Sequence, residues 1–283
     1  MGRLGIIAAS GTLPLELANR AKLQGENPFI ICLEGQADQD YSPFENLSFA
    51  PGKLKAVTAA LHDKSCDRLL LAGKFTRPSL SALKLDSAGA ALLGRLALKG
   101  DDKALRLVSE HFAEAQIKIL PNTDFLPNRT LPENYHFGRP LTSAEVSALN
   151  LGGSVLSQLG GLDVGQSVII QQDRVLGIEA AEGTQALIAR TAPLIDASAD
   201  AAVFVKMAKT QQDKILDMPV IGIATLKSLA EAGIGVAGVA AGQTMLADPL
   251  EAIEAELSLL GLVLTTSFDS KVAPSGNAEQ TSS

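Results

Sequence analysis

Short apolar runs alternate with amphipathic stretches along the first part of the chain. Apolar runs bounded by glycine, proline or polar residues are typical of buried strands, and apolar residues three and four positions apart are typical of helices. The pattern predicts strands over 4–9, 29–33, 68–72 and 117–120, and helices over 13–23, 52–61 and 101–115. Strand, helix and strand in succession form units with parallel strands, so we expect a doubly wound, Rossmann-like domain.

The periodicity fails between Pro121 and Leu141, where prolines and asparagines recur and no apolar repeat is sustained. We predict a Pro/Asn-rich linker there, with an N-terminal domain over 1–130 and a C-terminal domain over 131–269. From residue 270 the composition turns to Ser, Gly, Asn, Gln and Thr, which is typical of a disordered tail over 270–283.

Helical and strand patterns return after the linker. Two strands joined by Gln172-Asp173-Arg174 form a predicted hairpin. The predicted strands are 167–171, 175–180, 202–206, 220–221, 236–239 and 262–265, and the predicted helices are 143–159, 183–191, 225–232 and 249–260. The expected fold class is therefore α/β, with two domains, the second holding a mixed sheet.

Composition narrows the function classes. Hydrophobic residues make up 46% and charged residues 19%, as in folded globular proteins. A net charge of -7, with 4% aromatic residues and no Trp, argues against a nucleic-acid partner. Neither a signal peptide nor an apolar run of membrane-spanning length is evident, so we expect a cytoplasmic protein. Cys32 and Cys66 show no C-x-x-C spacing and are expected to be free, buried thiols.

A glycine turn follows the first predicted strand. Gly11, Thr12 and Leu13 lie where open α/β sheets place their ligands, and the turn exposes backbone N–H groups suited to an anion or a polar ligand edge. The G-x-G-x-x-G fingerprint is absent, because Leu13 and Glu16 stand at the second and third glycine positions. A simple N-cap by Ser10 or Thr12 explains this segment equally well.

Two further predicted helix starts carry polar residues, which could cap the helix or contact a ligand. They are Lys99, Asp101 and Asp102 in the first domain, and Glu182, Gly183 and Thr184 in the second. For Asp101 and Asp102, helix capping and a favourable interaction with the helix dipole are sufficient structural explanations.

The densest group of charged residues lies over 205–219. Two lysines, amides and two aspartates are the side chains that a diphosphate site needs, since lysines neutralise phosphate oxygens and carboxylates hold Mg²⁺ or orient water. They are Lys206, Lys209, Gln212, Asp213 and Asp217. A solvated surface loop with a chance mixture of charges is the alternative. The three histidines show no H-E-x-x-H spacing and no G-x-S-x-G motif occurs, which disfavours histidine metal clusters and serine hydrolases.

Six segments together resemble one family, the LpxI-type UDP-2,3-diacylglucosamine pyrophosphatases, over about residues 4–268. They are LGIIAASGTLPLELA (4–18), AGKFTRPSL (72–80), KGDDKALR (99–106), LDVGQSVII (162–170), EAAEGT (179–184) and VKMAKTQQDKILDMPVIGIAT (205–225). Their order and spacing, rather than any single segment, carry the resemblance.

The resemblance implies hydrolysis of UDP-2,3-diacylglucosamine to UMP and 2,3-diacylglucosamine 1-phosphate (lipid X) in lipid A synthesis, with Mg²⁺ as the activating ion. Water would attack the phosphate attached to the sugar, and the substrate would lie between the two domains. It also implies a cytoplasmic protein that contacts the inner-membrane surface transiently. A homodimer is left open.

The resemblance further implies residue roles. Asp217, Asp213 and Asp102 would be catalytic, and Asp217 and Asp102 would bind the metal. The substrate-binding residues would be Gly11, Thr12, Leu13, Lys99, Asp101, Glu182, Gly183, Thr184, Lys206, Lys209, Gln212 and Thr225. The chain departs from the family pattern at Gln185, where the family commonly has an acid, and at Thr210, where it has proline.

Two alternatives from other classes remain. A non-catalytic nucleotide-sugar binding or regulatory module would share the Gly11 turn but would not need the charged loop. A dinucleotide oxidoreductase would share the first β-α-β unit and would use an acid near Glu34, but it requires the missing glycines.

Overall fold

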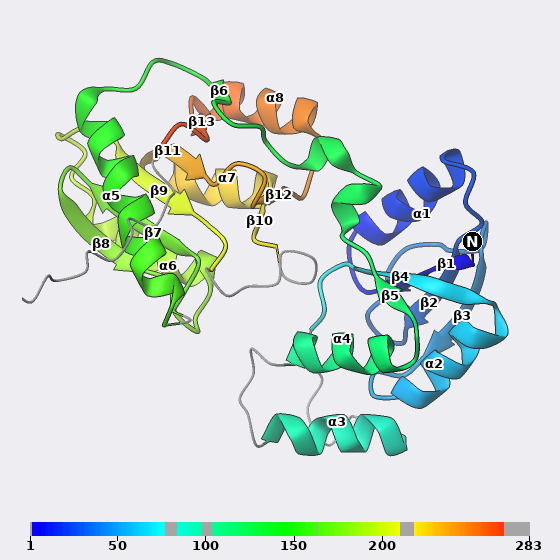
Figure 1. Cartoon of the computed structure of the whole chain (residues 1–283). Helices are drawn as coiled ribbons and strands as arrows, with labels where there is room; N and C mark the ends of the chain where they lie inside the picture. Colours follow the sequence, from blue (N-terminus) through cyan, green and yellow to red (C-terminus); the bar gives the residue numbers. More distant parts are fainter. Residues whose placement is uncertain (1, 77–83, 98–103, 163, 210–217, 269–283) are drawn as a thin grey trace, which may run out of the picture. The chain divides into compact units, whose positions relative to one another are not determined.

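The computed structural model describes residues 2–76, 84–97, 104–162, 164–209 and 218–268. These residues form two compact units, one that extends to Pro127 and one that begins at Asn128. Each unit is built around its own sheet (Figure 1). The predicted two-domain α/β fold is confirmed.

The first unit is a doubly wound parallel sheet, in which the described strands follow the order β3-β2-β1-β4-β5. All neighbouring pairs are parallel, as the predicted β-α-β units require. The strands are β1 (Arg3–Ala8), β2 (Phe29–Leu33), β3 (Glu45–Phe49), β4 (Cys66–Ala72) and β5 (Lys118–Ile119). The helices are α1 (Leu13–Leu23), α2 (Leu54–Asp63), α3 (Ser87–Ala97) and α4 (Ala104–Glu114).

Helices cover both faces of this sheet. On one face Leu17 of α1 packs in a buried cluster with Ile6 and Leu70. On the other face Leu61 of α2 and Phe112 of α4 pack with the strand residues there. Because side chains alternate across a strand, a strand with both faces covered is apolar along its whole length. This explains why β1 and β2 stand out in the sequence as continuous apolar runs.

The second unit holds a mixed sheet with the described order β6-β13-β11-β9-β7-β8. Its parallel core is β9, β11 and β13, while β7 pairs antiparallel with both β9 and β8. The strands are β6 (His136–Phe137), β7 (Ser167–Gln171), β8 (Arg174–Ile178), β9 (Ala202–Lys206), β11 (Ile234–Val239) and β13 (Val263–Thr265), and β10 (Val220–Ile221) pairs separately with β12 (Met245–Leu246). The helices are α5 (Ser143–Gly160), α6 (Thr184–Thr191), α7 (Ile223–Glu231) and α8 (Leu250–Leu260).

The central strand β9 is packed from both sides. Val205 lies in a buried cluster with Leu149 of α5, and Phe204 lies in the opposite cluster with residues of α6, α7 and α8. Gly152 allows α5 to approach closely, because a Cβ there would lie 2.5 Å from Cγ2 of Val205. The strand is therefore held rigidly, together with the residue at its carboxyl end, Lys206.

The prediction and the structure differ in particular elements. The hairpin is confirmed as β7 and β8, and five elements have the predicted bounds, namely α1, β2, β7, β9 and β10. The sequence pattern missed β3, α3, β6 and β12. The segment 121–141 contains the short 3-10 helices η3 (Asn122–Asp124) and η4 (Pro127–Arg129) together with β6, and η5 (Ala192–Leu194) follows α6. The predicted tail over 270–283 lies outside the described residues.

None of the helices in the described ranges is both long and apolar enough to cross a membrane.

The capping box of α5 generates a stability prediction. Thr142 Oγ1 accepts a hydrogen bond from the Glu145 N–H, and the Glu145 carboxylate accepts one from the Thr142 N–H. Thr142→Ala removes the first bond and should lower the free energy of unfolding by about 1 kcal/mol. Thr12, at the N-cap of α1, makes no side-chain capping bond, so Thr12→Ala should change it by less than about 0.5 kcal/mol. Urea titrations of both variants test this, and equal losses would contradict it.

Candidate functional site

Lys206 is a buried lysine at the carboxyl end of β9. The residue is buried, and only 4% of its surface is exposed. The Nζ atom donates to Thr184 Oγ1 at 2.9 Å and to Ser167 Oγ at 3.3 Å. Ser167 is brought opposite by the antiparallel register, which pairs it directly with Lys206. Two neutral hydroxyl groups therefore solvate the ammonium from two different segments.

Glu179, just after β8, completes this group. Thr184 Oγ1 donates to Glu179 Oε1 at 3.2 Å, and Glu179 Oε2 lies 4.0 Å from Lys206 Nζ. Thr184 thus accepts from the ammonium and donates to the carboxylate. We name Lys206, Glu179, Thr184 and Ser167 the Lys206 cluster.

Backbone geometry explains how the loop between β8 and α6 reaches the lysine. Gly183 is the N-cap of α6 and has φ +81, a conformation that favours glycine. Gly165 allows the backbone before β7 to pass against this loop, because a Cβ there would lie 1.9 Å from the Glu179 carbonyl oxygen. The Glu179 N–H donates to the Ser167 carbonyl at 2.8 Å. The Met207 N–H donates to the Gln166 carbonyl at 2.9 Å. These bonds fix the backbone on both sides of the Lys206 cluster.

The electrostatics of the Lys206 cluster favour an anion. Burial lowers the pKa of Lys206, and the nearby Glu179 carboxylate opposes this effect. An ammonium group has three N–H donors, and among the described residues two oxygens accept from it. The remaining donor can bind a phosphate oxygen, and in a buried setting such an interaction is stronger than in water.

The predicted EGT residues have separate roles in the structure. Thr184 belongs to the Lys206 cluster, and Gly183 provides the turn. The Glu182 carboxylate instead accepts from the Arg190 guanidinium at 3.0 and 3.1 Å. The pKa of Glu182 is lowered, chiefly by a hydrogen bond from its own backbone and next by the hydrogen bond from Arg190. The helix-capping alternative for Thr184 and Glu182 is wrong, since α6 has no side-chain cap.

The other residues predicted for this site fall into two groups. Thr225 lies in the first turn of α7, where Asp248 Oδ2 accepts from the Ile223 N–H at 2.9 Å. Lys209 is half-buried just beyond Met207. Gln212, Asp213 and Asp217, like Thr210, lie outside the described residues.

The Gly11 turn in the first unit carries a carboxylate on its backbone. Gly11 has φ +98, and its N–H donates to both oxygens of Asp38, at 3.0 and 3.1 Å. The pKa of Asp38 is lowered, chiefly by a hydrogen bond from Gln39 and next by that from Gly11. The turn is therefore able to bind an anion, as predicted from its position, and here the anion is a side chain of the same unit.

The capping alternative for this turn is not supported. Thr12 is the N-cap of α1 but makes no capping bond with its side chain. The Ser10 hydroxyl donates to the Lys74 carbonyl at 2.7 Å, next to a short backbone bridge between the same two residues. A Cβ on Gly73 would lie 2.7 Å from the Ser10 carbonyl oxygen, so the turns after β1 and β4 are in close contact. Leu13 begins α1 and is half-buried.

The remaining predicted residues and motifs contribute little geometry. Lys99, Asp101 and Asp102 lie outside the described residues. Within the described ranges, no group of three or more His, Cys, Asp or Glu side chains could hold a metal ion. His111 Nε2 lies 2.8 Å from Thr58 Oγ1, where it joins α4 to α2. Cys66 is a buried free thiol as expected, whereas Cys32 is only partly buried.

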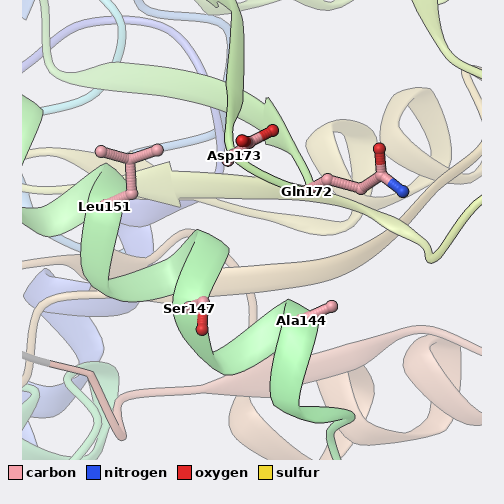
Figure 2. A pocket seen from close by; sticks show the side chains of 5 residues that line it. All are labelled: Ala144, Ser147, Leu151, Gln172 and Asp173. Atoms are coloured by element: carbon pink, nitrogen blue, oxygen red, sulfur yellow. The ribbon is translucent and has the colours of Figure 1, made fainter.

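A shallow hollow of about 420 Å³ lies beside the turn between β7 and β8 (Figure 2). It is lined by Ala144, Ser147 and Leu151 of α5 and by Gln172 and Asp173 of the turn. The turn follows the carboxyl end of β7, whereas Ser167 of the Lys206 cluster begins that strand. None of the predicted site residues in the described ranges lines this hollow.

Sequence reasoning did not single out Glu179, Ser167, Asp38 or Arg190. Glu179 and Ser167 lie within the quoted segments EAAEGT and LDVGQSVII, so a signal was present. Their roles emerge only from the pairing of β7 with β9 and with β8, which brings both segments against Lys206.

The fold and the site define a class, a two-domain α/β protein with a buried lysine cluster at the carboxyl end of a central strand. Sequence models of the LpxI N-terminal domain and the LpxI C-terminal domain match residues 3–129 and 132–264. UDP-2,3-diacylglucosamine pyrophosphatase LpxI of Caulobacter vibrioides is 33% identical over 272 residues, which cover 93% of this chain and 96% of that protein. The chain belongs to the LpxI family.

Solved structures give weaker similarities. The Bordetella bronchiseptica enzyme WbmG in complex with NAD and UDP is 14% identical with a TM-score of 0.29, over 42% of this chain and 36% of that one. The UDP-N-acetylglucosamine 4-epimerase from Bacillus cereus is 14% identical with a TM-score of 0.26, over 42% of this chain and 34% of that one. This chain spans about a third of each, and similarity at this level supports no conclusion about it.

The glycine that begins α6 generates a prediction. Gly183 combines φ +81 with ψ 169, a region that is open essentially to glycine alone. Gly183→Ala should lower the free energy of unfolding by about 1–3 kcal/mol, although no atom lies within 4 Å of the added Cβ. Gly94 in α3 has equally open surroundings but no such φ, so Gly94→Ala should raise stability by about 0.5–1 kcal/mol. Chemical denaturation decides the matter, and a neutral Gly183→Ala would refute the strain.

Proposed function

We propose that this chain hydrolyses the pyrophosphate bond of UDP-2,3-diacylglucosamine to UMP and 2,3-diacylglucosamine 1-phosphate (lipid X), a step of lipid A synthesis. The family match along both domains supports the proposal. The observation that carries it is the Lys206 cluster, in which Thr184 of the EGT segment and Lys206 of the charged loop meet at 2.9 Å.

The Lys206 ammonium supplies positive charge for the diphosphate. Water attacks the phosphorus attached to the sugar, the bond from that phosphorus to the bridging oxygen breaks, and UMP leaves with the bridging oxygen. Charge grows on the leaving phosphate during this step. A cation that is already positioned and partly shielded from water stabilises this charge without reorganising. Lys209, Gln212 and Thr225 are assigned to substrate binding on the same loop and helix, and Gly11, Thr12 and Leu13 to the nucleotide side.

The acidic residues would orient and activate the attacking water. Asp217 orients or deprotonates the attacking water, with Asp213 and Asp102 as the other catalytic carboxylates and with Lys99 and Asp101 beside the substrate. These five residues lie outside the described ranges, so their roles rest on the sequence. When bound by Asp217 and Asp102, Mg²⁺ would neutralise charge on the diphosphate oxygens, and carboxylates are suitable ligands for it.

Contact with a membrane is part of the proposal because the substrate is a lipid. We include in the proposal a cytoplasmic location with transient contact to the inner-membrane surface, and a homodimer remains open. Sedimentation of the protein alone and with anionic vesicles measures both the assembly state and the contact.

The direct test is incubation with UDP-2,3-diacylglucosamine and detection of UMP and lipid X. Release of both products supports the proposal. Tight binding without product would instead support the nucleotide-sugar binding module.

Asp217→Ala generates a kinetic prediction. If the carboxylate acts on the attacking water, kcat should fall by about 10²- to 10⁴-fold, while equilibrium binding of the substrate persists. Asp173→Ala is the control, since Asp173 is an exposed aspartate of the β7–β8 turn and should leave kcat unchanged. Unchanged turnover in Asp217→Ala would rule out a catalytic role, and lost binding with unchanged kcat would make Asp217 a binding residue.

The metal generates a separate prediction. Excess EDTA should abolish most UMP release and added Mg²⁺ should restore it, because the charge that develops on a cleaved diphosphate needs neutralisation. EDTA that is already saturated with Mg²⁺ is the control and should leave the rate unchanged. Full turnover in excess free EDTA would refute the metal requirement.

A further inference from the structure

Glu179 carries a feature that the proposed function leaves unused. Its Oε2 atom is buried and has no hydrogen-bond partner among the described residues, and the side chain is only 12% exposed. A buried carboxylate oxygen without a donor is costly and uncommon in folded proteins. Such a group requires an explanation, and the Lys206 ammonium lies 4.0 Å from it.

We propose that Glu179 is a positioning residue, which keeps the Lys206 ammonium in place and charged for a phosphate group of the substrate. The inference rests on the proposed function in so far as Lys206 binds the diphosphate. Glu179 itself does not touch substrate in this account, and it acts through Thr184 and through its charge.

Geometry supports an indirect role. Glu179 Oε1 accepts from Thr184 Oγ1 at 3.2 Å, which orients that hydroxyl so that its lone pair accepts from Lys206 Nζ at 2.9 Å. Glu179 Oε2, at 4.0 Å, is too far from Nζ for a direct hydrogen bond. A direct ion pair would occupy an ammonium N–H, whereas this arrangement keeps the charge near and, among the described residues, leaves one donor for an anion.

The charges around Lys206 single out Glu179. Strands β7 and β11 pair with β9 at Lys206, and the loop between β8 and α6 brings Thr184 and Glu179 to its ammonium. Of their ionisable groups in the described ranges, the Glu179 carboxylate is the one that acts on the charge of Lys206. Glu182 on the same loop is paired with Arg190. Removal of the Glu179 charge therefore leaves burial unopposed.

The sign of the effect follows from this arrangement. A lysine is charged below its pKa, and burial already lowers the pKa of Lys206. Without the carboxylate this pKa falls further, so the ammonium loses its proton at a lower pH. Phosphate binding and turnover that depend on the ammonium should then be lost at a lower pH.

Glu179→Gln tests the proposal, because the amide keeps the size of the side chain and an oxygen for Thr184. In the full-length protein labelled with ¹³C at the lysine Cε, with the Lys206 resonance assigned from Lys206→Arg, the titration midpoint of Lys206 should move to lower pH. The alkaline limb of kcat/KM for UDP-2,3-diacylglucosamine should move the same way. Above the limb, kcat/KM should fall about tenfold further than below it, the effect of removing one opposite charge from within about 4–6 Å.

Glu145→Gln is the matched control. Glu145 is a buried carboxylate of the same unit, 1% exposed and paired with Arg139. Its neutral variant should lose stability through that pair but should leave both the Lys206 midpoint and the alkaline limb in place. The two variants together separate a charge effect on Lys206 from the general cost of neutralising a buried acid.

Each outcome decides the inference. An unchanged Lys206 midpoint in Glu179→Gln overturns it, whatever happens to turnover. If that variant does not fold, Glu179→Asp withdraws the carboxylate by one methylene, and the midpoint should still move down, so an unchanged value there also overturns it. Should the wild-type protein release no UMP, the proposed function fails, while the NMR titration still tests the coupling between Glu179 and Lys206.

Discussion

The second unit depends on how it accommodates a buried ammonium group. A charge removed from water is very costly unless acceptors and an opposite charge replace the solvent. Lys206 ends a strand that is packed on both faces, so these groups must come from neighbouring segments. Ser167 comes from the antiparallel partner strand, and Thr184 and Glu179 come from the loop into α6. The antiparallel hairpin therefore has a function beyond extending the sheet, since it delivers both sets of polar groups to one point.

The first unit accommodates a carboxylate near the carboxyl end of β1, whereas the second unit accommodates an ammonium group at the carboxyl end of β9. In the Gly11 turn a backbone N–H, rather than a buried cation, binds the negative charge, and the Asp38 carboxylate accepts from it. In both units these groups gather at the carboxyl end of a parallel strand, where the following loops diverge and open sheets place their ligands. Both points are thus prepared for anions, one by a side-chain cation and the other by backbone geometry.

The sequence predicted those parts of the fold in which local pattern and burial agree. Strands β2, β7 and β9 each contain a short run of buried apolar residues, so their bounds could be predicted. Strand β3 was missed because its sequence, ENLSF, is largely exposed, with Leu47 44% exposed. Helix α3 was missed because Gly89 and Gly94 interrupt it and weaken the helical signal. Of the Lys206 cluster, the motif supplied Lys206 and Thr184, but an alternating pattern gives the face of a strand and not its neighbour, so Ser167 and Glu179 could not be placed.

The close approach of α5 to β9 links the position of Lys206 to the packing of the apolar core. The absence of a side chain at Gly152 lets Val205 press against the helix, and Val205 directly precedes Lys206. Interiors are densely packed and transmit small displacements. A single methyl group added at this contact would therefore shift the lysine relative to its acceptors. The packing at Gly152 therefore affects the geometry of the polar site as well as stability.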